Sequence, residues 1–163
     1  MLLRTSALLA ILAVCALVGH AQAEKPPGRA LCAAITPKQV MALFDRWNAS
    51  LATGNPASVV RNYAADAILL PTAENGPLIG RDAIRGYFVH FLERHPQGTI
   101  DQRTIRIGCN EAFDAGTYTF TLDGSEPGSR VKLPARFTYI YQPRGGLWLI
   151  VHHHSSAFPE PAH

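Results

Sequence analysis

The chain has 163 residues, of which 47% are hydrophobic, and carries a formal net charge of +3 at pH 7. This length suits one domain with a single core and leaves little room for a second. The positive charge is small and scattered. We find no block of Lys and Arg, no RNA-binding aromatic motif and no phosphate-cradling glycine loop, so the sequence predicts no nucleic-acid partner.

The first 23 residues have the pattern of an export signal. Arg4 supplies the positive start, residues 7–18 form an apolar core too short to span a bilayer, and residues 21–23 (AQA) match the cleavage site. Cleavage would leave Glu24 at the N-terminus and lower the net charge to +2, because Arg4 is the one charged residue removed. We therefore expect a periplasmic or secreted protein without membrane contact after cleavage.

Two alternatives to a cleaved signal remain open. In a lipoprotein, Cys15 would be the modified first residue, but residues 12–14 (LAV) place a branched side chain where a small one is needed. In an uncleaved anchor, the apolar run would have to be longer than this one.

Cleavage of the export signal would also change which cysteines remain in the protein. Cys15 leaves with the signal, and the mature chain keeps Cys32 and Cys109. In an oxidising compartment two such cysteines are expected to form one disulfide. The alternative is a pair of buried free thiols.

Residues 24–35 are predicted to be a flexible lead-in, residues 36–159 the domain and residues 160–163 a tail. The first helix should begin at Thr36, which can cap it, and end at residues 54–56 (GNP). Its apolar side chains recur at helical spacing, as Val40, Phe44, Trp47 and Leu51.

A shorter helix over residues 57–64, a buried strand over 67–70 and an irregular or hairpin-like stretch over 71–80 should follow. A third helix is expected from Arg81 to the stop signal at residues 96–98 (PQG). Its apolar stripe consists of Ile84, Phe88, Phe91 and Leu92.

From Thr99 onward the hydrophobic period changes from 3.6 to 2, which predicts strands. Turn residues separate the four expected strands, which span residues 99–109, 112–122, 130–142 and 147–156. Helices first and long antiparallel strands last indicate an α+β fold, with the helices packed on one face of a curved, mostly antiparallel sheet.

This order of elements resembles the cone-shaped nuclear transport factor two-like (SnoaL-like) superfamily. The C-terminal block, residues 134–159, is similar in detail to the end of the association domain of calcium/calmodulin-dependent protein kinase II and of its bacterial stand-alone relatives. There a Gly-x-Trp-x-Ile-Val-His-x-His strand closes the sheet, and residues 146–154 (GLWLIVHHH) match it. Residues 78–84 (LIGRDAI) also resemble a helix entry common in the superfamily. The resemblance implies an internal pocket and a homo-oligomer, expected to be a dimer formed through the sheet.

The sequence departs from the kinase domain within the pocket that the resemblance implies. That domain carries arginines on three strands, whereas this chain places Tyr139 and Ser155 at two of those positions and Thr117 near the third. The pocket therefore need not take the small carboxylate that clustered arginines favour.

The histidine run is the most distinctive candidate site. Strand alternation places His152 and His154 on one face and His153 on the other. Two imidazoles on one face could bind a transition metal with a third ligand such as His90 or Asp66, but two ligands are a weak signal and we expect no metal. The plainer interpretation packs Trp148, Ile150, His152 and His154 together as one hydrogen-bonded face.

A pocket histidine could instead serve as general acid or base, with Asp66, Tyr63 or Tyr139 orienting it. Arg136 stands alone among apolar strand residues, where a charge is usually paired, bound to an anion or at an edge. Ser155 lacks a nucleophile motif and is expected to hydrogen-bond. The candidate pocket residues are Tyr63, Arg136, Tyr139, His152, His153, His154 and Ser155.

Three hypotheses follow from these residues. The first is an exported, dimeric domain that binds a small organic molecule. The second is an enzyme of isomerase, dehydratase or hydrolase type that uses a pocket histidine and no cofactor, since no dinucleotide or flavin fingerprint occurs. The third is a pure oligomerisation module with an unused pocket.

Overall fold

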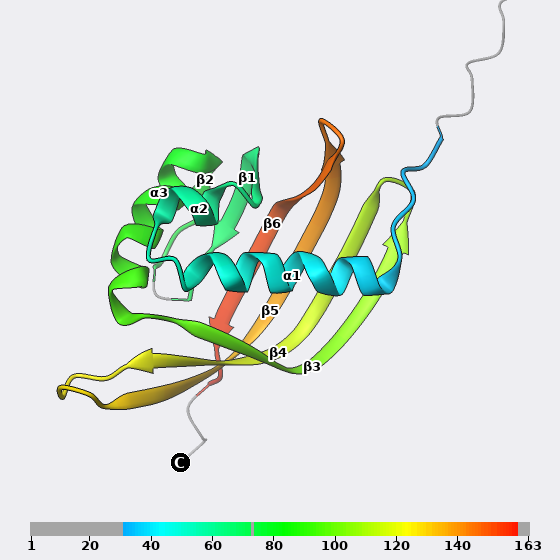
Figure 1. Cartoon of the computed structure of the whole chain (residues 1–163). Helices are drawn as coiled ribbons and strands as arrows, with labels where there is room; N and C mark the ends of the chain where they lie inside the picture. Colours follow the sequence, from blue (N-terminus) through cyan, green and yellow to red (C-terminus); the bar gives the residue numbers. More distant parts are fainter. Residues whose placement is uncertain (1–30, 73, 160–163) are drawn as a thin grey trace, which may run out of the picture. The chain divides into compact units, whose positions relative to one another are not determined.

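A six-stranded sheet of order β2-β1-β6-β5-β4-β3 organises the chain (Figure 1). The computed structural model describes residues 31–72 and 74–159. The expected export signal, most of the lead-in and the tail lie outside these residues. Among the helices in the described ranges, none is both long and apolar enough to cross a membrane.

The helices begin where the sequence offers caps. Helix α1 (Pro37–Leu51) starts with a capping box, in which the Thr36 and Gln39 side chains each bond the other's backbone N–H. Helix α2 (Pro56–Val60) is capped by Asn55, and α3 (Gly80–Phe91) continues into a short 3₁₀ turn, η1 (Leu92–Arg94). The prediction of a second helix reaching residue 64 was wrong, because the chain leaves α2 at Val60 and enters the sheet.

The strands are longer than the sequence pattern indicated. Their bounds are β1 (Tyr63–Leu70), β2 (Leu78–Ile79), β3 (Gln97–Gly108), β4 (Glu111–Asp123), β5 (Arg130–Arg144) and β6 (Leu147–Ala157). Strand β2 lies inside the stretch expected to be irregular or hairpin-like, and its antiparallel pairing with β1 agrees with the hairpin alternative. All pairs are antiparallel except that β1 runs parallel to β6. This parallel pair places the end of β1 beside the histidine run, with Leu69 opposite His153, and the start of β1, Tyr63, beside Ile150.

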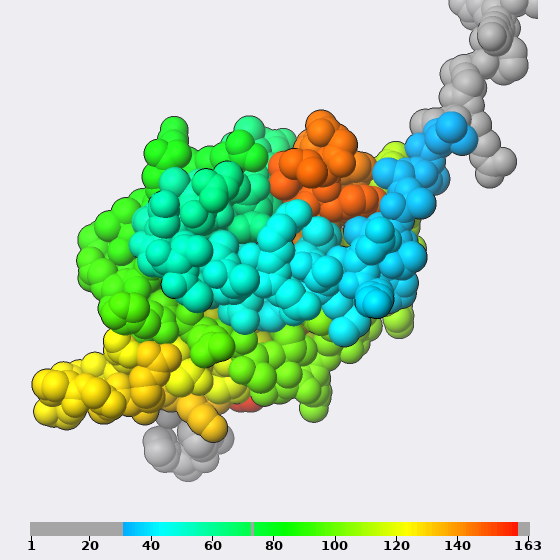
Figure 2. Space-filling model, viewed as in Figure 1, coloured from blue at the N-terminus to red at the C-terminus, as the bar shows by residue number. Residues whose placement is uncertain are grey.

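The core fills the space between α1, α3 and one face of the sheet. In Figure 1, α1 crosses in front of β3 to β6, and Figure 2 shows it covering much of that face. The buried side chains of α1 are the four predicted from helical spacing, Val40, Phe44, Trp47 and Leu51. Trp47 meets aromatic rings from three other elements, those of Phe88, Phe120 and Tyr139. The core therefore combines aliphatic side chains with many aromatic rings, and several of these rings carry buried hydroxyls, as in Tyr63, Tyr118 and Tyr139.

Two glycine sites let the sheet bend and reverse. Gly116 lies beside a register shift in β3, where an added Cβ would come to 2.0 Å from the Gln102 carbonyl oxygen. No other residue fits so close an approach. Gly145 and Gly146 have φ of 58° and 81° in the tight turn between β5 and β6, a conformation that glycine adopts without steric cost.

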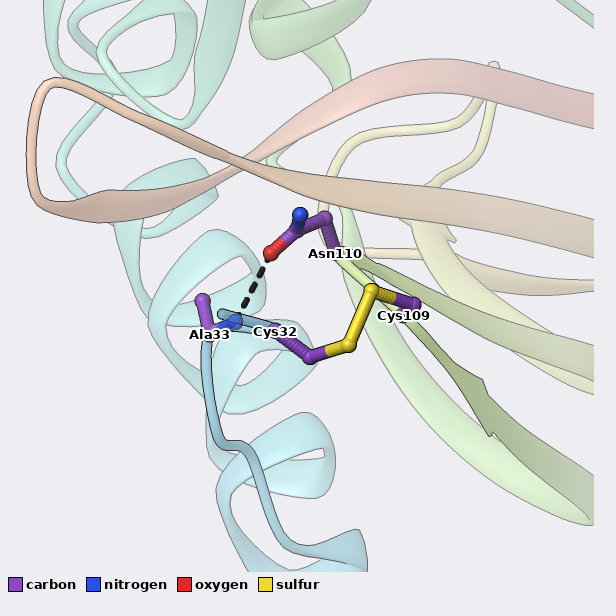
Figure 3. Close-up of a disulfide and its surroundings, with 4 residues drawn as sticks. All are labelled: Cys32, Ala33, Cys109 and Asn110. Carbon is purple, nitrogen blue, oxygen red and sulfur yellow. Dashed lines mark hydrogen bonds between the residues drawn. A yellow bond between two sulfur atoms is a disulfide. The ribbon is translucent and has the colours of Figure 1, made fainter. Parts of the chain in front are cut away.

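A disulfide joins Cys32, ahead of α1, to Cys109 at the end of β3 (Figure 3). The neighbouring Ala33 N–H donates to Asn110 Oδ1 at 2.7 Å. These two links anchor the segment before α1 to the turn between β3 and β4. They connect parts of the chain 77 residues apart.

Removing the disulfide should lower the free energy of unfolding. Closing a loop of 77 residues removes denatured-state entropy worth about 4 to 5 kcal/mol in the chain-entropy model. We expect a Cys32→Ser, Cys109→Ser double variant to lose up to this amount in urea denaturation. Wild-type protein treated with a reductant is the matched control and should lose a similar amount. Equal stability of the oxidised wild type and the variant would contradict the prediction.

Candidate functional site

The face of β6 that carries His153 points into the core. His153 is 3% exposed, while His152 and His154 are half-buried on the opposite face. The predicted packed face of Trp148, Ile150, His152 and His154 was wrong. Tyr141 pairs with Ile150 and Ile140 with His152, so Val151 is an extra residue that breaks the alternation. Ile150 is therefore in the core with His153, and His152 is outside it.

His153 is held by neighbours from both adjacent strands and from α1. Its Nδ1 lies 2.8 Å from the Tyr63 hydroxyl, which accepts a hydrogen bond of 3.0 Å from Trp47 Nε1. Its ring stacks on Tyr139, the residue opposite it on β5, with centroids 4.1 Å apart. The parallel pairing of β1 with β6 brings Tyr63 into reach. The imidazole thus lies in an aromatic box with one nitrogen bound.

Burial changes the acid–base chemistry of this histidine. Removal from water disfavours the charged imidazolium, and nearby His152 and His154 add to the effect, so the pKa of His153 falls from 6.5 to about 3. The imidazole is therefore neutral at physiological pH. Burial also raises the pKa of Tyr63 and of Tyr118. The site presents hydrogen-bonding groups rather than charges.

Ser155 forms a second hydrogen-bonded group beside His153. Its hydroxyl accepts from the Tyr118 hydroxyl at 2.6 Å and also contacts the Thr72 hydroxyl. Thr72 follows β1, and Tyr118 comes from β4. Ser155 has no activating base among these neighbours, which agrees with a structural or binding role.

A small cavity lies between these two groups and α3. Its volume is about 10 Å³, room for about one water molecule. His153 and Ser155 line it together with side chains that are mostly aromatic or aliphatic, namely Trp47, Leu69, Pro71, Thr72, Tyr87, Phe88, Phe91, Tyr118 and Phe120. The cavity is an apolar space with a polar end.

An outer groove adjoins this cavity. It has a volume of about 280 Å³ and shares Thr72, Tyr87 and Phe91 with the cavity. Tyr87 and Phe91 stack at 5.5 Å and form the common wall. The groove's other lining residues are Glu74, His90, Arg94, Leu122 and Leu133. Tyr87 and Phe91 therefore line both the groove and the cavity that holds His153 and Ser155.

The seven candidate residues divide between two places. Tyr63, Tyr139, His153 and Ser155 come together inside. Arg136 lies on the outside of β5, where its Nη2 donates to the Ala157 carbonyl, and His152 and His154 lie on the outer face. Trp47 and Thr72 also contact these interior residues. The sequence did not identify them as site residues, because Trp47 was assigned to the core and Thr72 to a turn.

A second polar cluster lies under α1 and was not foreseen. Arg103 on β3 donates to Asp114 on β4 at 3.1 Å; the Asp114 side chain is fully buried and that of Arg103 is 14% exposed. Burial raises the pKa of Asp114, although the Arg103 charge and hydrogen bond oppose this. The hydroxyls of Tyr139 and Tyr141 have no partner within the described ranges, nor do Asp114 Oδ2 and Arg103 Nη2. An ion pair between neighbouring strands has no sequence motif, so the sequence alone could not predict this one.

The two outer histidines do not meet a third ligand here. Across residues 31–72 and 74–159, no three side chains of His, Cys, Asp or Glu gather closely enough to hold a metal ion. His90, named above as a possible third ligand, instead lines the outer groove on α3.

Comparison with solved structures defines the class of fold. A nuclear transport factor 2-like protein with a cystatin-like fold from Novosphingobium aromaticivorans matches with a TM-score of 0.64 and 11% identity, covering 77% of this chain and 83% of that one. A proposed dehydratase of the same class from Streptomyces avermitilis matches with a TM-score of 0.67 and 13% identity, covering 76% and 97%. At these identities the likeness concerns the fold alone. The chain has the nuclear transport factor 2-like cone.

A sequence-family match assigns the chain more specifically than the fold does. The sequence profile of the calcium/calmodulin dependent protein kinase II association domain matches residues 36–159, and the chain belongs to this family. A proposed association domain of this kind from Xanthomonas campestris is 48% identical, with a TM-score of 0.74, covering 81% of this chain and 94% of that one. A comparison with curated proteins gave no match. The family resemblance seen in the sequence is confirmed.

The buried neutral histidine predicts a pH dependence of stability. The unfolded chain binds a proton at His153 below pH 6.5, while the folded chain does so only near pH 3. The neutral imidazole therefore leaves the free energy of unfolding unchanged by pH above pH 6.5. Below it, this free energy falls by up to about 1.4 kcal/mol per pH unit. Urea denaturation between these pH values should show this slope. The slope should be clearly smaller in His153→Phe, where only the lowered pKa of His152 still contributes, and should persist in the matched control His154→Phe. A slope unchanged in His153→Phe would refute the assignment.

Proposed function

We propose that this protein binds a small organic molecule, whose polar end reaches His153 and Ser155 and whose body occupies the outer groove. The observation that carries the proposal is a buried polar atom on the cavity wall. His153 Nε2 is shielded from water and has no hydrogen-bond partner in the part of the chain that is described. A buried polar group without a partner costs about 1 to 3 kcal/mol, which a ligand supplying a partner would recover.

The groove supports the same proposal. Its lining by Leu122, Leu133 and Phe91 is mainly apolar, and its volume of about 280 Å³ suits a small molecule. Tyr87 and Phe91 also line the cavity, together with His153 and Ser155. An apolar entrance leading to a few polar groups is the usual arrangement of a ligand pocket.

Binding is better supported than acid–base catalysis by His153. An effective general acid or base has a pKa near the working pH. The pKa of His153 is about 3, so the imidazole is a weak base and holds no extra proton to give. The proposed dehydratase among the neighbours is 13% identical, which supports no transfer of its activity to this chain.

Export and dimerisation belong to the same proposal. The disulfide between Cys32 and Cys109 is typical of an oxidising, extracytoplasmic compartment. The outer face of the sheet carries Ile68, His152, Ile140 and Phe113 side by side on four strands, and no helix of the described ranges packs on it. A row with three apolar side chains on an uncovered sheet face favours contact with a second copy, and the matched family is that of an association domain.

Filling the groove should weaken ligand binding. A Leu133→Trp variant places a large ring among the groove residues, so we expect at least tenfold weaker binding of small aromatic probes. The panel is acetophenone, benzyl alcohol, benzoate and benzylamine, followed by chemical-shift changes at Tyr87, Phe91 and His153. Val131→Trp is the matched control, since Val131 is exposed on the same strand. If none of the four probes shifts these signals in the wild type, the proposal fails.

Placing a charge on the outer sheet face should separate the dimer. An Ile140→Glu substitution puts a carboxylate at the centre of the apolar row, and burying it in an interface without a partner is costly. Light scattering should give a dimer mass for the wild type and a monomer mass for the variant. Ile68→Glu, at a more exposed position of the same row, should act likewise, and Val89→Glu on α3 should remain dimeric. A monomeric wild type would contradict the prediction.

A further inference from the structure

Three side chains from α1, β1 and β6 form one hydrogen-bonded chain. The Trp47 indole Nε1 can only donate, and it lies 3.0 Å from the Tyr63 hydroxyl oxygen. That oxygen therefore accepts from Trp47. The hydroxyl hydrogen of Tyr63 remains available for His153 Nδ1, which lies 2.8 Å away.

The direction of these bonds determines the tautomer of His153. If Tyr63 donates to Nδ1, this nitrogen is an acceptor and the neutral imidazole carries its hydrogen on Nε2. In the reverse arrangement Nδ1 would donate, and the phenolic hydrogen would have no acceptor among the described residues. Leaving that buried hydrogen unpaired would cost about 1 to 3 kcal/mol. The Nε2–H tautomer is therefore favoured.

The cavity consequently offers one free N–H donor. His153 lines the cavity, and Nε2 is the ring nitrogen that lacks a partner in the described ranges. The hydroxyl of Ser155 is already bonded to Tyr118 and Thr72. A ligand that reaches the polar end thus meets a donor and needs an acceptor.

The surroundings of this donor exclude a strong charge on the ligand. The cavity is lined by aromatic, aliphatic and hydroxyl side chains, without Arg, Lys, Asp or Glu. An ionised carboxylate or amine taken from water into this space would lose its hydration without an opposite charge in contact. The charged residues Glu74 and Arg94 line the groove and not the cavity. The polar end therefore suits a neutral group.

We infer that the pocket selects small neutral molecules with a flat apolar body and an acceptor oxygen, such as a carbonyl, which receives a hydrogen bond from His153 Nε2–H. Trp47 and Tyr63 are positioning residues, because they hold the tautomer without touching the ligand. This inference rests on the proposed ligand-binding function. It adds the chemical class of the ligand and the reason for it.

The tautomer can be measured without any ligand. Two-bond ¹H–¹⁵N spectra of the purified protein at pH 7 should give His153 a bare Nδ1 and a protonated Nε2. Tyr63→Phe should abolish this strong preference and mix the two tautomers, whereas Tyr139→Phe keeps the stacked ring and should leave the spectrum unchanged. If Tyr63→Phe fails to fold, Trp47→Phe removes the first donor and should weaken the preference. A protonated Nδ1 in the wild type would overturn the inference whatever the pocket binds.

The ligand class can be tested with isosteric probes. Acetophenone and α-methylstyrene have similar shapes, but only the first carries an acceptor oxygen; benzoate adds a negative charge. We expect acetophenone to bind about tenfold more tightly than either, which is the discrimination expected from one hydrogen bond. Tyr63→Phe should reduce this ratio. Equal binding of acetophenone and α-methylstyrene, or tighter binding of benzoate, would overturn the inference and leave the proposed function standing. Failure of every probe to perturb the groove would overturn both.

Discussion

The parallel pairing of β1 with β6 is the contact on which the interior site depends. β6 would otherwise be the edge of an antiparallel meander, with one neighbour and one open side. With β1 alongside, Tyr63 and Leu69 lie next to the inward face of β6, and the strand is buried between two partners. Trp47 of α1 then closes the space above it through its bond to Tyr63. The imidazole of His153 is surrounded on three sides before any ligand is considered.

This enclosure sets the chemistry of the site. A histidine at the surface titrates near neutral pH and can exchange protons with a substrate. The same side chain in an aromatic box remains neutral, and its one tautomer makes it a fixed hydrogen-bond donor. The family resemblance implied a pocket with clustered arginines, but here Tyr139 and Ser155 stand at two of those positions. Under the proposed function, this interior offers a neutral hydrogen-bond donor where clustered arginines would favour an anion.

Much of the fold follows from local pattern. The four buried residues of α1 and the change to period-2 alternation after Thr99 were readable because helices and strands repeat over short distances. The end of α2 was not, because Tyr63 and Ala64 are equally compatible with a helix, and only pairing with β6 draws them into a strand. The Arg103–Asp114 pair depends on a register shift between β3 and β4 that Gly116 permits. No periodicity in the sequence marks that shift.

The amino-acid sequence by itself determined the family, the α+β class, the pairing of Cys32 with Cys109 and the alternation that separates His153 from its two neighbours. These depend on motifs, composition and local periodicity. Tertiary structure alone decided which face of β6 is buried, that Val151 is an extra residue in the strand, and that Trp47 and Tyr63 act on His153. The physical reason is that burial and hydrogen-bond direction arise from contacts between distant segments. A histidine in a strand becomes a neutral donor only when those segments close around it.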